Sequence, residues 1–139
     1  MISLIIGKVP ENVSKTHKEL LKILSKIKPH HKIFCEYPVR KLFDKLNETD
    51  NSVLIKAKHL SFDFYDDTGQ IIFEIQGGQH DRFNQFFHKN FGGFDRQRRN
   101  DSIKNLICML TNIKLIKIKS DIKLTEKIVL EYYKGVDYV

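Results

Sequence analysis

The sequence predicts an α/β protein with a central mixed β-sheet flanked by helices. Three observations support this class: short apolar stretches alternate as strands do, longer stretches have helical periodicity, and turn-forming residues separate them. In chain order, the main elements read αβ(β)ββαβα. No internal repeat, low-complexity tract or Pro/Gly-rich linker interrupts the 139 residues, so we expect a single domain over residues 1–139.

The N-terminal part is predicted to contain a short strand in MISLII, a helix and a second strand. Ser14 is expected to cap a helix that runs to about Lys28, because leucines and isoleucines recur there at helical spacing. Residues 32–38, KIFCEYP, have the composition of a strand. An irregular segment follows, and residues 53–57 are a weaker strand candidate.

Two further strands are predicted over residues 60–66 and 70–76, joined by the turn-forming sequence DDTG. A connection of about 20 residues follows, GGQHDRFNQFFHKNFGGFDRQ, and its length and glycines suggest a functional loop, with or without a short helix. The C-terminal part then predicts a helix, a half-buried strand and a last helix, at residues 97–111, 113–118 and 123–134.

The composition favours a polyanionic partner. The formal net charge is +7, which suits nucleic acid, although a lysine-rich composition also produces basic proteins that bind no polyanion. No run of about 18 apolar residues is present, so we expect no membrane span. Cys35 and Cys108 form no CxxC pair, and buried structural thiols in a reducing cytoplasm are the expected reading.

Asp63 and Glu74 are predicted to share one face of the two central strands. If the connecting loop has an even number of residues, residue 65 pairs with 70 and residue 63 with 72. The acids are then diagonal neighbours, about 7–8 Å apart between their Cα atoms. An odd loop would place them on opposite faces. Gln76 falls on the acidic face, and the opposite, core face takes Phe62, Phe64, Ile71, Phe73 and Ile75.

Two carboxylates placed side by side require a cation. At 4 Å and an effective dielectric constant near 20, their repulsion costs about 4 kcal/mol. Oxygen ligands favour a hard ion, so Mg²⁺ or Mn²⁺ is the expected cofactor. The alternative is that lysine or arginine side chains neutralise both acids.

The order FDF, then EIQ with ten residues between Asp63 and Glu74, resembles the core motif of the PD-(D/E)xK nuclease superfamily. The sequences GGQH, RND and NIKLIKI continue the likeness toward the branch of very-short-patch-repair endonucleases and EDxHD-type homing endonucleases, which has small phage-encoded members. The resemblance covers roughly residues 33–118. It implies a restriction-endonuclease-like core and a metal-dependent endonuclease that hydrolyses DNA phosphodiester bonds, acting in the cytoplasm of a host cell if phage-encoded.

The same resemblance assigns roles to individual residues. Asp63 and Glu74 would bind the metal, with the Ile75 carbonyl as a third ligand. Gln76 stands where the family has lysine, and glutamine can position water but carries no charge. Lys104 is then a candidate substitute from the following helix. His80 would act as general base or contact a phosphate; the alternative is a loop histidine without a role.

A further acid and the DNA contacts are also implied. Glu19 and Glu36 compete for the acid that the family often supplies near its first helix, unless His17 takes that position. Asp101 would match another family acid, or else pair with Arg98 or Lys104 on its own helix. The expected nucleic-acid contacts are Arg82, His88, Lys89, Arg96, Arg98 and Arg99.

Alternatives to this assignment follow from the same segment. Phe83, Phe86, Phe87, Phe91 and Phe94 either stack on bases or build a satellite core or a homodimer contact. A zinc site formed by His80, His88 and Cys108 lacks paired ligand spacing. The expected partner is DNA, with RNA as an alternative. Because Gln76 replaces the family lysine, the competing function is a catalytically degenerate module that binds nucleic acid or protein.

Overall fold

The computed structural model describes residues 4–11, 13–46, 59–76 and 91–135. Within these ranges the chain contains the strands β1 (Leu4–Ile6), β2 (Lys32–Pro38), β3 (Ser61–Asp66), β4 (Ile71–Gln76) and β5 (Lys114–Lys119). The helices there are α1 (Lys15–Ile27), α2 (Arg40–Phe43), α5 (Phe91–Leu110) and α6 (Glu126–Tyr133). The predicted strand over residues 53–57 and most of the long connection lie outside the described residues.

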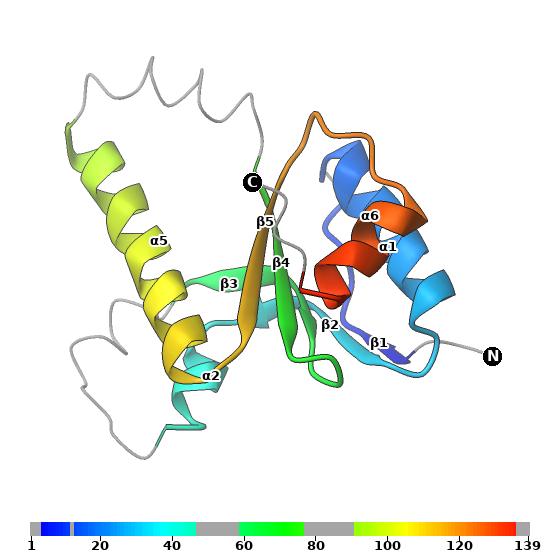
Figure 1. Cartoon of the computed structure of the whole chain (residues 1–139). Coiled ribbons are helices and arrows are strands. Elements are labelled where there is room, and N and C mark those ends of the chain that lie inside the picture. The colour runs from blue at the N-terminus through cyan, green and yellow to red at the C-terminus, as the bar shows by residue number, and fades with distance from the viewer. Residues whose placement is uncertain (1–3, 12, 47–58, 77–90, 136–139) are drawn as a thin grey trace.

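The strands form one five-stranded mixed sheet in the order β1-β2-β3-β4-β5. The pairs β2–β3 and β3–β4 are antiparallel, whereas β1–β2 and β4–β5 are parallel. Helices α1 and α6 lie on one side of the sheet, and α5 and α2 lie on the other (Figure 1). The predicted class, α/β with a mixed sheet flanked by helices, is therefore confirmed.

Both faces of the central strands are buried, which corrects the prediction of a single core face. Phe64, Ile71 and Phe73 pack with α1 and α6, as expected for one face. Phe62 instead belongs to the second cluster, under α2 and α5, together with Tyr65 and Ile72. Strands covered on both sides read as nearly continuous apolar runs rather than as alternating ones.

Local signals in the sequence predict some element boundaries well and others poorly. Ser14 caps α1, and its side chain accepts a hydrogen bond from the His17 amide. Strand β2 has the predicted bounds. Helix α5 begins at Phe91 rather than near Gln97. The sequence predicted a later start because the two glycines after Phe91 are poor helix formers, yet both are helical here. None of the described helices has the length and apolarity needed to cross a bilayer.

A buried carboxylate fixes the end of the β3–β4 hairpin. Asp66 is fully buried and accepts hydrogen bonds from the Tyr133 hydroxyl at 2.6 Å and the Gly69 amide at 2.8 Å. His31 Nδ1 lies 2.6 Å from the same carboxylate. A Cβ atom at Gly69 would come within 2.8 Å of Asp66 Oδ2, so only glycine allows this close approach.

Tyr133→Phe should lower the free energy of unfolding by about 1–3 kcal/mol, because it removes one donor from a fully buried carboxylate. Urea denaturation followed by circular dichroism measures the change. Tyr37→Phe is the matched control, since no hydrogen bond to the Tyr37 hydroxyl is present within the described residues. An equal loss of stability in both variants would contradict the role given to Asp66.

Candidate active site

The β3–β4 register differs from the predicted one. Phe64 pairs with Phe73 and Asp66 with Ile71, so the connection is residues 67–70 rather than 66–69. The shift arises because the buried Asp66 stays within β3, where Tyr133 and the Gly69 amide bind its carboxylate. The loop is nevertheless even in length. Continuing the register places residue 63 directly opposite residue 74, not diagonally as predicted.

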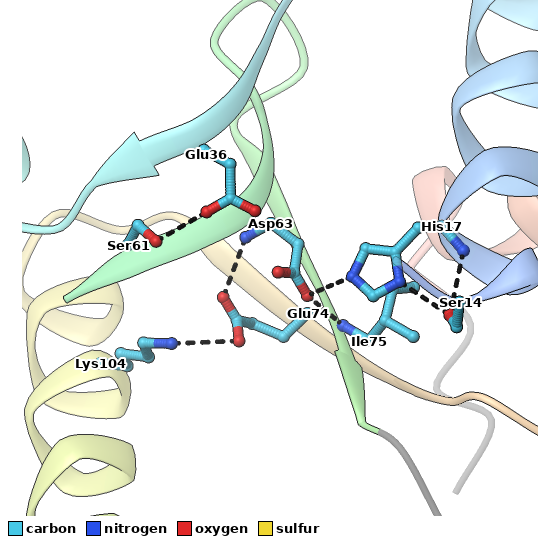
Figure 2. A network of polar contacts seen from close by, with 8 residues as sticks. All are labelled: Ser14, His17, Glu36, Ser61, Asp63, Glu74, Ile75 and Lys104. Atoms are coloured by element: carbon cyan, nitrogen blue, oxygen red, sulfur yellow. Dashed lines mark hydrogen bonds and ion pairs between the residues drawn. The ribbon is translucent and has the colours of Figure 1, made fainter. Parts of the chain in front are cut away.

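Asp63 and Glu74 bridge the two strands where the backbone pairing ends. The last paired residues are Phe64 and Phe73. Beyond them the Asp63 amide donates to Glu74 Oε1 at 3.1 Å, and the Ile75 amide donates to Asp63 Oδ2 at 2.7 Å (Figure 2). Each carboxylate therefore accepts the hydrogen bond of a backbone amide on the neighbouring strand. The two acids come together at the end of the central ladder.

A histidine from α1 contacts the Asp63 carboxylate. His17 Nε2 lies 3.4 Å from Asp63 Oδ2, the same oxygen that accepts the Ile75 amide. The other ring nitrogen, Nδ1, is 2.8 Å from the Ser14 hydroxyl. Ser14 caps α1 and thereby orients the imidazole three residues later. His17 lies in the first turn of α1, three residues after the capping Ser14.

A lysine from α5 contacts the Glu74 carboxylate. Lys104 Nζ lies 3.1 Å from Glu74 Oε2, and both side chains are largely buried. The ammonium group also lies 5.6 Å from the centre of the Phe62 ring, which helps to fix it. Lys104 therefore brings a positive charge to the acid pair from α5.

The Glu74 carboxyl has a raised pKa. Burial raises the pKa to about 7; Lys104 opposes this change and the charge of Asp63 adds to it. Lys104 thus compensates only part of the cost of ionising Glu74. A buried carboxylate whose negative charge is only partly neutralised is able to bind a cation or to accept and release a proton.

Glu36 lies at the border of this group. Its backbone has a φ of 52°, and its carboxylate accepts a hydrogen bond from the Ser61 hydroxyl at 2.9 Å. Figure 2 shows the carboxylate between Ser61 and Asp63. Glu19, the competing acid, instead pairs with Lys15 one turn away on α1, at 3.8 Å. Glu36 therefore lies on the strand that pairs with β3 beside Asp63, whereas Glu19 contacts Lys15 within α1.

The donor chemistry of this site suits Mg²⁺ or Mn²⁺ in part. Asp63 and Glu74 offer carboxylate oxygens, the ligand type that hard cations prefer. Because burial destabilises the ionised Glu74 carboxylate, a cation bound beside it would stabilise that charge. Lys104 already neutralises part of the acid charge, and His17 contacts Asp63. Within the described residues, no group of three or more His, Cys, Asp or Glu side chains is arranged to hold a metal ion.

The remaining predicted site residues lie on β4 and α5 or outside the described residues. Gln76 is exposed at the end of β4, where its carbonyl accepts the Ser120 amide at 2.7 Å. Asp101 is half-buried on α5. Cys108 is buried, and burial raises the pKa of its thiol to about 12. Exposed residues of α5 include Arg96, Arg98 and Arg99. The predicted residues that lie outside the described part are His80, Arg82, His88 and Lys89.

Sequence patterns had identified the acids, but not the hydroxyl groups that hold this network. Ser14 was expected only as a helix cap, and it also contacts His17. Ser61 carried no signal of its own, because its contact with Glu36 depends on the β2–β3 pairing. The spacing from Ser14 to His17 places the two on one helical turn, and this is the signal from which their contact could have been inferred.

Comparison with known proteins finds a viral relative of part of the chain. The chain is 30% identical over 93 residues to Uncharacterized protein 033L of Invertebrate iridescent virus 3. The match covers 67% of this chain and 48% of the viral protein, so the chain spans about half the length of the curated relative it matches. No family model and no solved structure matches the chain.

Proposed function

We propose that this protein is a metal-dependent endonuclease that hydrolyses DNA phosphodiester bonds on a restriction-endonuclease-like core. The observation that carries the proposal is the meeting of Asp63 and Glu74 at the end of the central ladder, joined by reciprocal bonds to backbone amides. The resemblance to PD-(D/E)xK nucleases requires acids on adjacent strands. Strands β3 and β4 provide them.

The metal ligands in this proposal are Asp63 and Glu74, with Glu36 and the Ile75 carbonyl as further oxygen donors. When bound there, Mg²⁺ or Mn²⁺ would supply Lewis-acid activation of a phosphate and of a water molecule. The carboxylates are held ready for this role: the Ile75 amide and His17 fix one oxygen of Asp63, and the Asp63 amide fixes one oxygen of Glu74.

Lys104 supplies the positive charge that the family's lysine would provide and that Gln76, at that position, lacks. Its ammonium is 3.1 Å from Glu74 and comes from α5, so it can stabilise the negative charge that develops on a phosphorane beside the acids. Gln76 and His80 are proposed to position the attacking water, with the imidazole accepting its proton near neutral pH.

The second candidate is a nucleic-acid-binding module without catalysis. It is favoured by the contacts of Lys104 with Glu74 and of His17 with Asp63, which resemble a permanent polar network. A structural network of this kind would need no cation. The two candidates make opposite predictions for the effect of divalent ions on the protein.

Incubation of the purified protein with supercoiled plasmid DNA tests the function. We expect conversion to nicked or linear DNA with Mg²⁺ or Mn²⁺ and none with EDTA, because the acids hold the ion that activates water. Parallel reactions with single-stranded DNA and with RNA define the substrate. Salt-sensitive DNA binding without cleavage under any divalent ion would favour the binding module.

A further inference from the structure

A pair of lysines on β5 lies beside the acid pair. Strand β5 pairs with β4 in parallel, and the register places Lys117 next to Glu74 and Lys119 next to Gln76. Both lysines are exposed. Within the described sheet β5 is an edge strand, so the pair lies at an open border of the sheet.

The alternation of β5 directs the two lysines to the side of the sheet that carries α5. Ile116 and Ile118 are buried against the α1 and α6 side, so residues 117 and 119 point the opposite way. Lys114, on the other side, instead donates to the Tyr132 carbonyl of α6 at 3.2 Å.

We propose that Lys117 and Lys119 bind the phosphate backbone of a nucleic acid next to Asp63 and Glu74. The pair continues the line of Glu74 and Gln76 across the sheet, and it needs no side chain of the long connection. Residues two apart on a strand are separated by about 6.6 Å, so each flexible lysine can reach its own phosphate. The partner rests on the proposed function.

This pair is better placed than the arginines predicted from the sequence. Arg96, Arg98 and Arg99 lie in the N-terminal half of α5, which diverges from β5 in Figure 1. Lys117 lies directly beside Glu74 in the sheet. The competing explanation is that edge-strand lysines only prevent sheets of two molecules from pairing. That role requires charge at the edge but no contact with phosphate.

Fluorescence anisotropy of a labelled DNA duplex without divalent ions tests the proposal, since binding is then measured apart from cleavage. Lys117→Ala/Lys119→Ala should weaken binding by about 10- to 100-fold and reduce the slope of log K against log salt by about 2, because two phosphate contacts are lost. Lys117→Arg/Lys119→Arg should retain both values. The control Lys123→Ala/Lys127→Ala removes the same charge from exposed lysines near and on α6.

An equal loss in the β5 and control variants, or no loss in the β5 variant, overturns the proposal, as does a wild type that binds no duplex. A second duplex, of RNA, separates the two sources of phosphate. If the β5 variant loses affinity for DNA alone, or for both DNA and RNA, the result supports the site and identifies its ligand. The proposed hydrolysis fails independently, if wild type binds DNA with the predicted salt slope yet cleaves nothing with Mg²⁺ or Mn²⁺.

Discussion

Asp63→Asn should reduce the rate of plasmid cleavage by a factor on the order of 10²–10³, the usual cost of removing one preorganised charge-stabilising group from a site. Asparagine has nearly the same shape as aspartate. Its carbonyl oxygen can still accept the Ile75 amide and the contact from His17, both of which meet at Oδ2. Only the negative charge and one anionic oxygen are lost. The measurement is the initial rate of plasmid nicking with Mg²⁺.

Asp67→Asn is the matched control for this substitution. Asp67 lies on the same hairpin, and its carboxylate contacts the Tyr65 hydroxyl at 2.8 Å and Lys45 at 3.5 Å, away from the acid pair. Its removal should change the rate less than twofold, as expected of a substitution that touches no part of the site. Equal cleavage by wild type and Asp63→Asn would refute the assigned site, even if the protein proved to be a nuclease.

Glu74→Gln should raise the free energy of unfolding of the metal-free protein at pH 8. The change caused by the substitution should be about 3 kcal/mol more favourable at pH 8 than at pH 4. The reason is the pKa of Glu74, which burial raises from 4.5 to about 7. The native state therefore holds this proton more tightly than the unfolded chain does. The stabilisation is fully present below pH 4.5 and is lost as the pH rises through 7. Glutamine, like protonated glutamate, avoids the cost of a buried charge.

Urea unfolding in EDTA at both pH values measures this difference. Glu126→Gln is the control, because it makes the same substitution in a more exposed pair, that of Glu126 with Lys26. A Glu74→Gln variant that is destabilised at pH 8 would indicate that the pair with Lys104 is structural. A variant that is stabilised but inactive would show that the carboxylate is retained for function at the expense of stability.

Much of the fold follows from local sequence signals. Ser14 and the spacing of the apolar residues after it define α1, and β-forming residues bounded by turn formers define β2, β3 and β4. Such signals depend on near neighbours in the chain, so they can be read without a structure. The even length of the β3–β4 connection was also predicted correctly. The shared face predicted for Asp63 and Glu74 was wrong, because Asp63 contacts His17 of α1 and Glu74 contacts Lys104 of α5, on opposite sides of the sheet.

What the sequence did not reveal depends on contacts between distant residues. The β3–β4 register is displaced because Asp66 is bound by Tyr133, 67 positions away along the chain. Phe62 lies in the second core cluster and Phe64, two residues later, in the first, so the regular alternation of side chains along β3 is interrupted at Asp63. The resemblance makes Lys104 a candidate substitute for the family lysine, but its contact with Glu74 depends on how α5 packs. Periodicity carries no information about these pairings.

The central claim is that Asp63 and Glu74 together hold a divalent cation. Crystals soaked in Mn²⁺ and measured near the manganese absorption edge test it most directly, because anomalous scattering locates the ion itself. We predict a single strong anomalous peak about 2.0–2.2 Å from oxygens of both carboxylates, with Lys104 displaced from Glu74. Carboxylates that remain bonded to Lys104 and His17 in saturating Mn²⁺, with no peak between them, would contradict the account.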